Sequence, residues 1–435
     1  MSLIRIFQNE FRRQITATLL DIRRTREQNK KRFELDRERI MNELIQKIEP
    51  LKISHKYTNE LGKPDDFNIA AVDGSGVYPL VTIEDIDIIV ESYYLAVHNT
   101  GTNERNLFHN VSKEENPNFF SKGHLETKWI SQDDGEPIRY IHEQLIEYYP
   151  VYDDTNNRIE EPTAADFQKI INTYYEEMKK HYNIENKPLF NEDMLIEGIT
   201  ISAANLFSTS MRIGELGIAK RAIVEGSNLR YMLLDGSLSF KYDPTTMLPT
   251  DIIGYLLRDI LKTARDHNVI VMAVSKTHTI PFTNEAIAIA NEIFGNNSRW
   301  YIRLPGGIPS EQGLRILENR RYIPPPLTVP YLVQLDPNKP TLRVDFDALW
   351  WRENIYDEDI NTLHENEHQI FQDLDFMSRG IYWVGYPAPL AVAHNNCKIS
   401  RDTERILYNM LIEIATGLGF NSNLFLNQRE LIHIR

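Results

Sequence analysis

The chain has 435 residues, of which 42% are hydrophobic, so it can bury a large core in one domain or in a few. Its single cysteine excludes an internal disulfide framework and a thiolate zinc site, and no uninterrupted apolar run reaches the ~18 residues that a membrane span requires. The net charge of −14 argues against a protein that coats nucleic acid non-specifically, but not against an enzyme that gathers carboxylates around metal ions.

Residues 1–50 carry apolar side chains at helical spacing and predict one long helix or two joined helices, ended by Pro50. We assign 1–55 to an N-terminal helical arm, which packs on its own domain or docks on a partner or second subunit. Charges among the apolar positions differ from a secretory signal, so we expect a cytoplasmic protein. The apolar stripe consists of Ile4, Phe7, Phe11, Ile15, Leu19 and Ile22 and resumes at Phe33, Ile40, Leu44 and Ile48.

Two β-rich segments come next, at 67–80 and 86–99, and predict strands joined by tight turns. Residues 100–195 then change in character, since they are rich in Asn, Asp, Glu and Pro, with one helix expected near 165–182. We interpret this region as an insertion, a surface layer rather than core, within a domain that spans 56–435.

The pattern of a buried core returns after this region. Residues 198–224 predict a helix that carries Glu215, and 229–238 predict a strand. A helix is expected at 251–267 and a buried strand at 268–276. Continuous apolar strands separated by helices indicate an α/β fold whose sheet is covered on both faces.

The last part of the chain gives weaker signals. The region 303–340 is rich in Pro and Gly and predicts mostly loop and edge structure. Residues 381–400 predict an extended strand that leads into a C-terminal helix. No internal repeat is present at the period of a solenoid.

Asp73 and Asp235 each begin an Asp-Gly-Ser tripeptide where an apolar run stops. Each should therefore emerge at the carboxyl end of a buried strand, the edge at which open α/β sheets bind ligands. Carboxylates on neighbouring strands can share cations such as Mn²⁺ and Mg²⁺; the alternative is ordinary turn chemistry, since Asp and Gly dominate turns. A haloacid-type phosphatase is disfavoured, because the second aspartate that it needs is replaced by Ser75 or Ser237.

Several motifs follow one another in a recognisable order. They are AVDGS at 71–75, a glutamate on a helix, LLDGSL at 233–238, VSKT at 274–277 and GYPAPLAVAH at 385–394. In this order they resemble the NurA nuclease family, over about 65–100 and 196–400. The resemblance implies an RNase H-like core with a mixed sheet, activity on DNA with Mn²⁺, and a hexameric ATPase partner of the HerA type.

The resemblance also assigns roles to single residues. It makes Asp73 and Asp235 metal ligands on neighbouring strands, and His394, at the start of the C-terminal helix, a further ligand or proton-transfer group. Tyr386 would lie beside the site, where its hydroxyl holds a ligand or the substrate phosphate. Lys276, at a strand end, either offsets charge on the scissile phosphate or is a solvated surface lysine.

The helical carboxylate has two candidates. Glu225 precedes Gly226 and Ser227, so it falls at or beyond the helix end, whereas Glu215 lies within the helical pattern and can project toward the strand ends. We choose Glu215 as a catalytic and metal-binding residue, and Glu225 stays open. The alternative for either residue is an exposed carboxylate on a helix.

We therefore expect a Mn²⁺- or Mg²⁺-dependent deoxyribonuclease that hydrolyses single-stranded DNA and DNA ends with two ions; the family alone implies 5′-to-3′ polarity. The expected partners are DNA and a HerA-like hexameric ATPase, in DNA end resection, repair or anti-phage defence. A homodimer would suit a ring-shaped ATPase. The alternative is a catalytically weak or inactive subunit that binds such an ATPase through the N-terminal arm and the region 100–195.

Overall fold

The computed structural model describes residues 12–21, 23–24, 27–28, 50–53, 67–83, 86–100, 109–131, 136–153, 155, 157–182, 187, 189–190, 203–238, 252–278, 280, 283–304, 327–379 and 384–420. The first of these ranges is helical, as expected, and its side chains are exposed, among them Ile15 and Leu19. The rest of the expected N-terminal helix lies largely outside the described residues. Within the described part of the chain, no helix is both long and apolar enough to cross a membrane.

One mixed sheet of ten strands organises the fold, in the order β1-β8-β9-β10-β7-β6-β2-β3-β4, with β5 also paired to β3. The strands are β1 (Pro50–Lys52), β2 (Asn68–Ile83), β3 (Ile86–Asn99), β4 (His109–Asn110), β5 (Lys122–Ser131), β6 (Leu229–Asp235), β7 (Ile270–Ser275), β8 (Trp300–Arg303), β9 (Thr328–Gln334) and β10 (Leu342–Asp347). The helices are α2 (Glu136–Tyr148), α3 (Ala164–Tyr182), α4 (Ala203–Glu225), α5 (Ile252–Asp266), α6 (Thr283–Phe294), α8 (Ala348–Asn354), α9 (Ile360–Met377), α10 (Ala388–Cys397) and α11 (Arg401–Gly417).

The strands β5, β3, β2, β6 and β7 form the core of the sheet, and all of them except β5 agree with strands expected from the sequence. β2, β3 and β5 are an antiparallel meander, and β6 and β7 continue the sheet in parallel with β2. α4 leads into β6, and α5 connects β6 to β7. This is the strand arrangement of an RNase H-like fold, so the predicted α/β class with a mixed sheet is confirmed.

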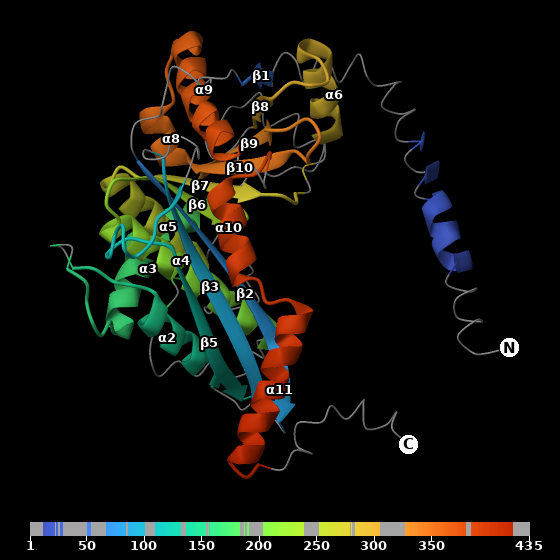
Figure 1. Ribbon diagram of the computed structural model, residues 1–435. Coiled ribbons are helices and arrows are strands. Elements are labelled where there is room, and N and C mark those ends of the chain that lie inside the picture. Colours follow the sequence, from blue (N-terminus) through green and yellow to red (C-terminus); the bar gives the residue numbers. More distant parts are fainter. Residues whose placement is uncertain are drawn as a thin grey trace.

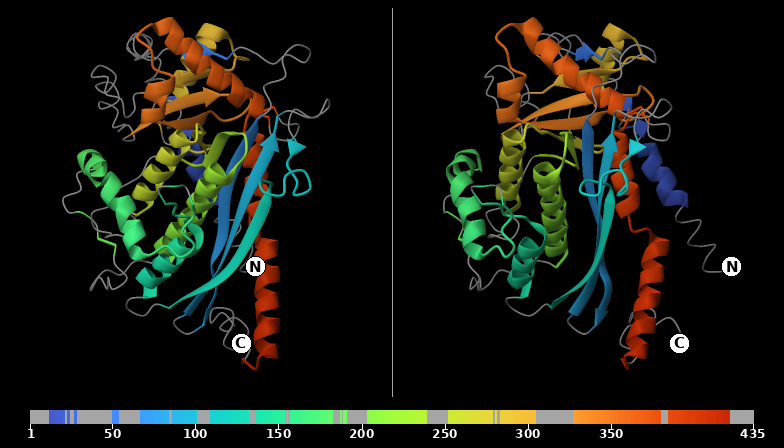
Figure 2. Two further views of the ribbon diagram at one scale, coloured as in Figure 1. Left: turned by 90° about the vertical axis from the view of Figure 1, so that its left-hand side faces the viewer. Right: turned by 60° about the vertical axis from the view of Figure 1, so that its left-hand side comes forward.

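Helices cover both faces of this core (Figures 1 and 2). Successive residues of β2 point to opposite faces, because side chains alternate along a strand. Ala70 and Val72 pack with α2, α3, α4 and α5, whereas Ile69 and Ala71 pack with α8, α9 and α10. α11 covers the far end of the β2–β3 hairpin. The end of β6 therefore lies between α4 on one face and α10 on the other.

The elements with strong periodicity agree with the sequence predictions. The helix expected near 165–182 is α3, and those expected at 198–224 and 251–267 are α4 and α5. The buried strand expected at 268–276 is β7. In each case a continuous apolar stripe or run identifies the element, because burial requires it.

The expectation that residues 100–195 form a surface layer outside the core is wrong for the described part of this region. β5 pairs with β3 along its whole length, and Leu145 of α2 and Phe167 of α3 are fully buried in the largest core cluster. The polar composition misled the interpretation, because one face of β5 and of each helix is solvated. Whether the boundaries at 100 and 195 mark an insertion stays a prediction.

The prediction of edge structure for the region 303–340 is wrong for β9, which is an interior strand. Most of the predicted loop falls on 305–326, outside the described residues. β9 lies between β8 and β10, and all of its residues are buried. Pro330 suggested an edge because proline cannot donate a ladder hydrogen bond, but its carbonyl accepts one from Leu304 N–H. The residues 384–387 form a turn rather than the expected strand, and the helix expected after them is α10.

Candidate metal centre

Asp73 and Asp235 lie side by side because of the parallel register of β2 and β6. Val72 pairs with Leu234, so the next residue of each strand is an aspartate. Asp235 is the last residue of β6, as predicted, but Asp73 lies inside β2, which continues to Ile83. The expectation that both aspartates end their strands is therefore wrong for Asp73. The site forms where β6 stops beside a strand that continues.

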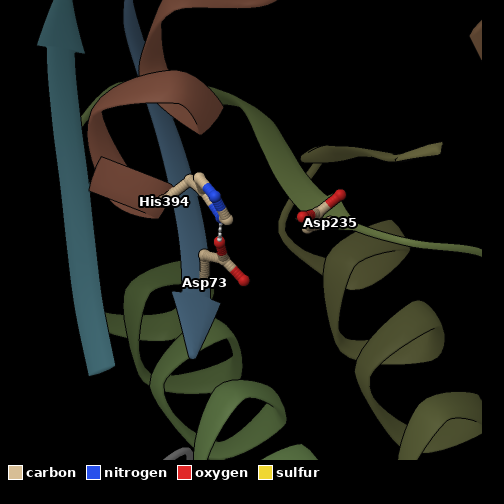
Figure 3. Close-up of side chains that lie close together, drawn as sticks. All are labelled: Asp73, Asp235 and His394. Atoms are coloured by element: carbon tan, nitrogen blue, oxygen red, sulfur yellow. Dashed lines mark hydrogen bonds and ion pairs between the residues drawn. The ribbon is translucent and has the colours of Figure 1, made fainter. Parts of the chain in front are cut away.

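His394 joins the two aspartates from α10. Its Nδ1 lies 2.8 Å from Oδ2 of Asp73, and ligand atoms of Asp73, Asp235 and His394 all lie within 4.8 Å of one another (Figure 3). His394 belongs to the last turn of α10, not to the start of the C-terminal helix as expected. Small residues such as Ala391 and Ala393 are buried on this helix, which lets its backbone approach β2 and β3 closely.

Glu215 reaches the same place from α4, on the opposite face of the sheet. Its Oε1 accepts a hydrogen bond of 3.1 Å from the Gly74 N–H, which also lies 2.9 Å from Oδ1 of Asp73. Gly74 makes this approach possible, because a Cβ at that position would lie only 2.9 Å from Oε1 of Glu215. The carboxylate therefore enters the site through the space that a side chain would fill.

Glu225, the other candidate, lies elsewhere. It is the last residue of α4, is exposed, and accepts a 3.5 Å hydrogen bond from the Tyr152 hydroxyl. Of the two glutamates, Glu215 contacts the segment that carries Asp73, whereas Glu225 lies at the other end of this stretch of helix. The catalytic role of Glu215 stays a prediction.

The negative charge of the acidic side chains at this site is only partly compensated by neighbouring positive charges and hydrogen-bond donors. Burial raises the pKa of Asp73, and the charge of Asp235 raises it further, while His394 and the Gly74 N–H act in the opposite direction. Burial also raises the pKa of Glu215 despite Arg212, whose Nη1 lies 2.6 Å from Oε2. Crowded carboxylates of this kind favour a bound proton or a bound cation.

Tyr386 and Lys276 border the site. The Tyr386 hydroxyl donates a hydrogen bond of 3.4 Å to Oδ1 of Asp235, and Lys276 Nζ lies 4.1 Å from the centre of the Tyr386 ring. Burial, followed by the charges of Asp235 and Asp73, raises the pKa of Tyr386, so its hydroxyl stays protonated. Lys276 is exposed just after β7, where it can meet either a substrate phosphate or water.

The turn after Asp235 is held by contacts that sequence reasoning missed. Gly236 has φ of +99°, a conformation that favours glycine, and its carbonyl accepts a 2.6 Å hydrogen bond from Ser275. The buried Asp345 of β10 accepts a 3.1 Å hydrogen bond from Leu238 N–H and pairs with Arg343 through two hydrogen bonds of 2.8 Å. No local pattern indicates the contact of Asp345 with Leu238, because the two residues are 107 positions apart in sequence.

Two further groups near the carboxylates carry a local signal that was overlooked. Arg212 stands three residues before Glu215 on α4, the spacing of an ion pair on one helix face. Cys397 stands three residues after His394 on α10, and its thiol donates to the His394 carbonyl at 3.5 Å. Burial raises the pKa of Cys397, and Asp73 and Glu215 raise it further, so the thiol is neutral.

The residues present fit a hard divalent cation. Asp73 and Asp235 offer carboxylate oxygens, and His394 offers an imidazole nitrogen at 41% side-chain exposure, so the group is open to solvent. Glu215 stands outside this group of three, and its two oxygens contact Gly74 N–H and Arg212. Mn²⁺ and Mg²⁺ prefer such ligands and keep positions for water or phosphate. The arrangement can therefore hold a cation beside an anionic substrate.

Comparisons with known proteins gave similar structures but no similar sequences. The chain matches no protein-family model and no curated protein. It is similar to the NurA nuclease from Sulfolobus solfataricus, with a TM-score of 0.46, 14% identity, and coverage of 93% of this chain and 98% of that one. A structure of NurA bound to dAMP and manganese has a TM-score of 0.33 and 13% identity, with 92% and 95% covered. A structure of NurA with manganese has a TM-score of 0.36 and 13% identity, with 94% and 100% covered.

Proposed function

We propose that this chain is a metal-dependent DNA nuclease of the NurA type, which hydrolyses phosphodiester bonds in single-stranded DNA and at DNA ends. The observation that carries the proposal is the convergence of Asp73, Asp235 and His394. Asp73 and His394 are 321 residues apart in sequence, yet their side chains contact each other at 2.8 Å. The pKa values of Asp73 and Glu215 are raised where these carboxylates gather. Such perturbed pKa values are typical of functional sites, and a purely structural role would not require them.

The proposed cofactor is Mn²⁺ or Mg²⁺, with two ions. Asp73, Asp235, Glu215 and His394 would hold them, the histidine either as a ligand or through its hydrogen bond to Asp73. Such ions, when bound, lower the pKa of a coordinated water and neutralise charge on the phosphate that is cleaved.

The chain's own residues supply the rest of the proposed chemistry. The Lys276 ammonium lies where it can pair with a phosphate oxygen as negative charge develops there. The Tyr386 hydroxyl holds Asp235 in place through its hydrogen bond. Arg212 opposes the effect of burial on the pKa of Glu215 and directs this carboxylate toward Gly74. His394 can receive or donate a proton at the ring nitrogen that does not face Asp73.

We propose further that the enzyme is a homodimer that works in the cytoplasm with a HerA-like hexameric ATPase, in DNA end resection, repair or anti-phage defence. These assignments rest on the motif resemblance. The rival hypothesis, a catalytically weak subunit, differs in one measurable way, because its chain would cleave no DNA even when metal is supplied.

The experiment that tests the proposal is cleavage of end-labelled single-stranded DNA by the purified chain with Mn²⁺, with Mg²⁺ and with EDTA. Asp73→Asn and Asp235→Asn keep the size of each side chain and remove a ligand charge, so each should lower the rate at least about a hundredfold. Asp402→Asn, at an exposed aspartate of α11, is the matched control and should leave the rate unchanged.

Cleavage that persists in EDTA, or in both site variants, would overturn the proposal. If the wild-type chain cleaves nothing alone but does so after addition of a HerA-type ATPase, the nuclease assignment holds and the partner is required. No cleavage in either condition supports the rival hypothesis.

A further inference from the structure

A cavity of about 300 Å³ lies between β5, α2 and α4, apart from the metal centre. Tyr93 and Leu95 of β3 line this cavity together with residues of β5, and Tyr93 pairs with Gly74 of β2, so the cavity begins one strand away from Asp73. Ile218 and Arg221 of α4 form its other wall. The cavity therefore lies on the face of the sheet opposite α10 and His394, and none of the four metal-centre residues lines it.

The carboxylates that line this cavity are already neutralised within the protein. Lys128 Nζ lies 2.9 Å from Oε2 of Glu126 and 2.9 Å from Oε2 of Glu147. His124 Nε2 lies 2.9 Å from Oε1 of Glu126. Burial and a hydrogen bond to Glu147 raise the pKa of Glu126, whereas the pKa of Glu147 is lowered by that bond and by Lys128 despite its burial. Lys128 and His124 thus offset much of the negative charge of these two side chains, although Oε2 of Glu126 is buried without a hydrogen-bond partner.

The cations that line the cavity are not neutralised. Among the described residues, neither Lys122 nor Arg221 forms an ion pair, and the Nε of Arg221 is buried without a hydrogen-bond partner. Burial lowers the pKa of Arg221, and the neighbouring Arg158 lowers it further, although Glu225 acts in the opposite direction. An unpaired guanidinium beside a second one is costly, unless an anion compensates both.

We propose that this cavity binds the phosphate group of a mononucleotide. Arg221 offers the planar set of donors that matches phosphate oxygens, and Lys122 offers a second positive charge at the solvent side. The volume lies at the lower end of the range for small-molecule sites, and Leu95 and Ile218 give it an apolar wall for the rest of the ligand. The inference does not depend on the proposed nuclease function.

The test is binding of inorganic phosphate, thymidine monophosphate and thymidine to the full chain in EDTA, measured by isothermal titration calorimetry and by thermal stabilisation. Without metal, the crowded carboxylates of Asp73, Asp235 and Glu215 repel a phosphate, so binding under these conditions reports on the cavity. We expect the monophosphate to bind, inorganic phosphate to bind more weakly, and thymidine not to bind.

Lys122→Gln and Arg221→Gln should each weaken binding of the monophosphate by about tenfold or more, since each removes a charged donor. Lys122 is exposed and its variant should fold normally, which keeps the test decisive if the Arg221 variant is unstable. The matched control is Arg401→Gln, at the exposed start of α11, which should bind as the wild type does. No binding by the wild type, equal binding of thymidine, or unchanged binding in both variants would overturn the proposal. Binding of inorganic phosphate as tight as that of the monophosphate would exclude a nucleotide.

Discussion

Replacing Gly74 by alanine tests how Glu215 enters the metal centre. The added Cβ would lie 2.9 Å from Oε1 and 3.1 Å from Cγ of Glu215, and 3.2 Å from Cδ1 of the Tyr93 ring. Ordinary contact begins at 3.4 Å, so the carboxylate must retreat by at least 3.4 − 2.9 = 0.5 Å. Such a movement breaks its 3.1 Å hydrogen bond to the Gly74 N–H.

The size of the effect follows from this displacement. Because a misplacement of ~1 Å in an active site can cost ~100-fold in rate, a shift of half that size should lower kcat about tenfold. Gly74 does not have a positive φ, so the backbone tolerates alanine and the cost in stability is that of overpacking, about 1–3 kcal/mol. The assay is steady-state cleavage of labelled single-stranded DNA at saturating Mn²⁺, beside denaturant unfolding.

Two further variants make this prediction decisive. Gly417→Ala is the matched control, since nothing lies within 4 Å of a Cβ there, and it should keep full activity. Shortening the acid by Glu215→Asp in the Gly74→Ala background should restore part of the lost rate, because it returns space to the added methyl group. Full activity of Gly74→Ala together with an inactive Glu215→Gln would refute the reasoning, since Glu215 would then act without its approach through Gly74.

Three other perturbations have defined outcomes. Asp345→Asn leaves the mostly buried Arg343 without its charged partner and should lower the free energy of unfolding by about 3 kcal/mol, measured with urea. Tyr386→Phe removes the hydroxyl that holds Asp235 and should lower kcat about tenfold with an unchanged melting temperature. In EDTA the raised pKa of Asp73 means that protonation of this carboxyl stabilises the folded state at acid pH. This stabilisation is complete below the ordinary pKa of 3.8 and is lost as the pH rises through the raised pKa of the folded state. Asp73→Asn should therefore weaken the fall in stability toward neutral pH.

Controls separate each of these outcomes from general damage to the fold. Asp402→Asn removes an exposed aspartate and should change neither the unfolding free energy nor its pH dependence. An Asp345→Asn variant as stable as the wild type would show that the pair with Arg343 contributes nothing. Equal pH dependence of the melting temperature in the wild type and Asp73→Asn would show that Asp73 is not perturbed in the folded protein.

Local sequence patterns were sufficient to identify most of the candidate site. The two Asp-Gly-Ser elements, the helical position of Glu215 and the spacing of Tyr386 and His394 can each be recognised within one segment. Periodicity also identified α3, α4, α5 and β7, because each buries a continuous stripe or run. The same reasoning failed for β5, because polar residues on its solvated face obscure the strand pattern, and for β9, because it contains a proline. Both strands are stabilised by pairing with neighbouring strands that the local sequence does not reveal.

The sequence by itself therefore determined which side chains are the candidates for the chemistry, since residue type and local periodicity are properties of one segment. Only the tertiary structure decided how they meet. The register of β2 against β6 brings Asp73 beside Asp235, and α10 brings His394 to within 2.8 Å of an aspartate 321 residues earlier. The passage of Glu215 across the sheet at Gly74 depends on the packing of α4 against β2. Register and packing arise from contacts between distant segments, so they cannot be predicted from the periodicity of either segment alone.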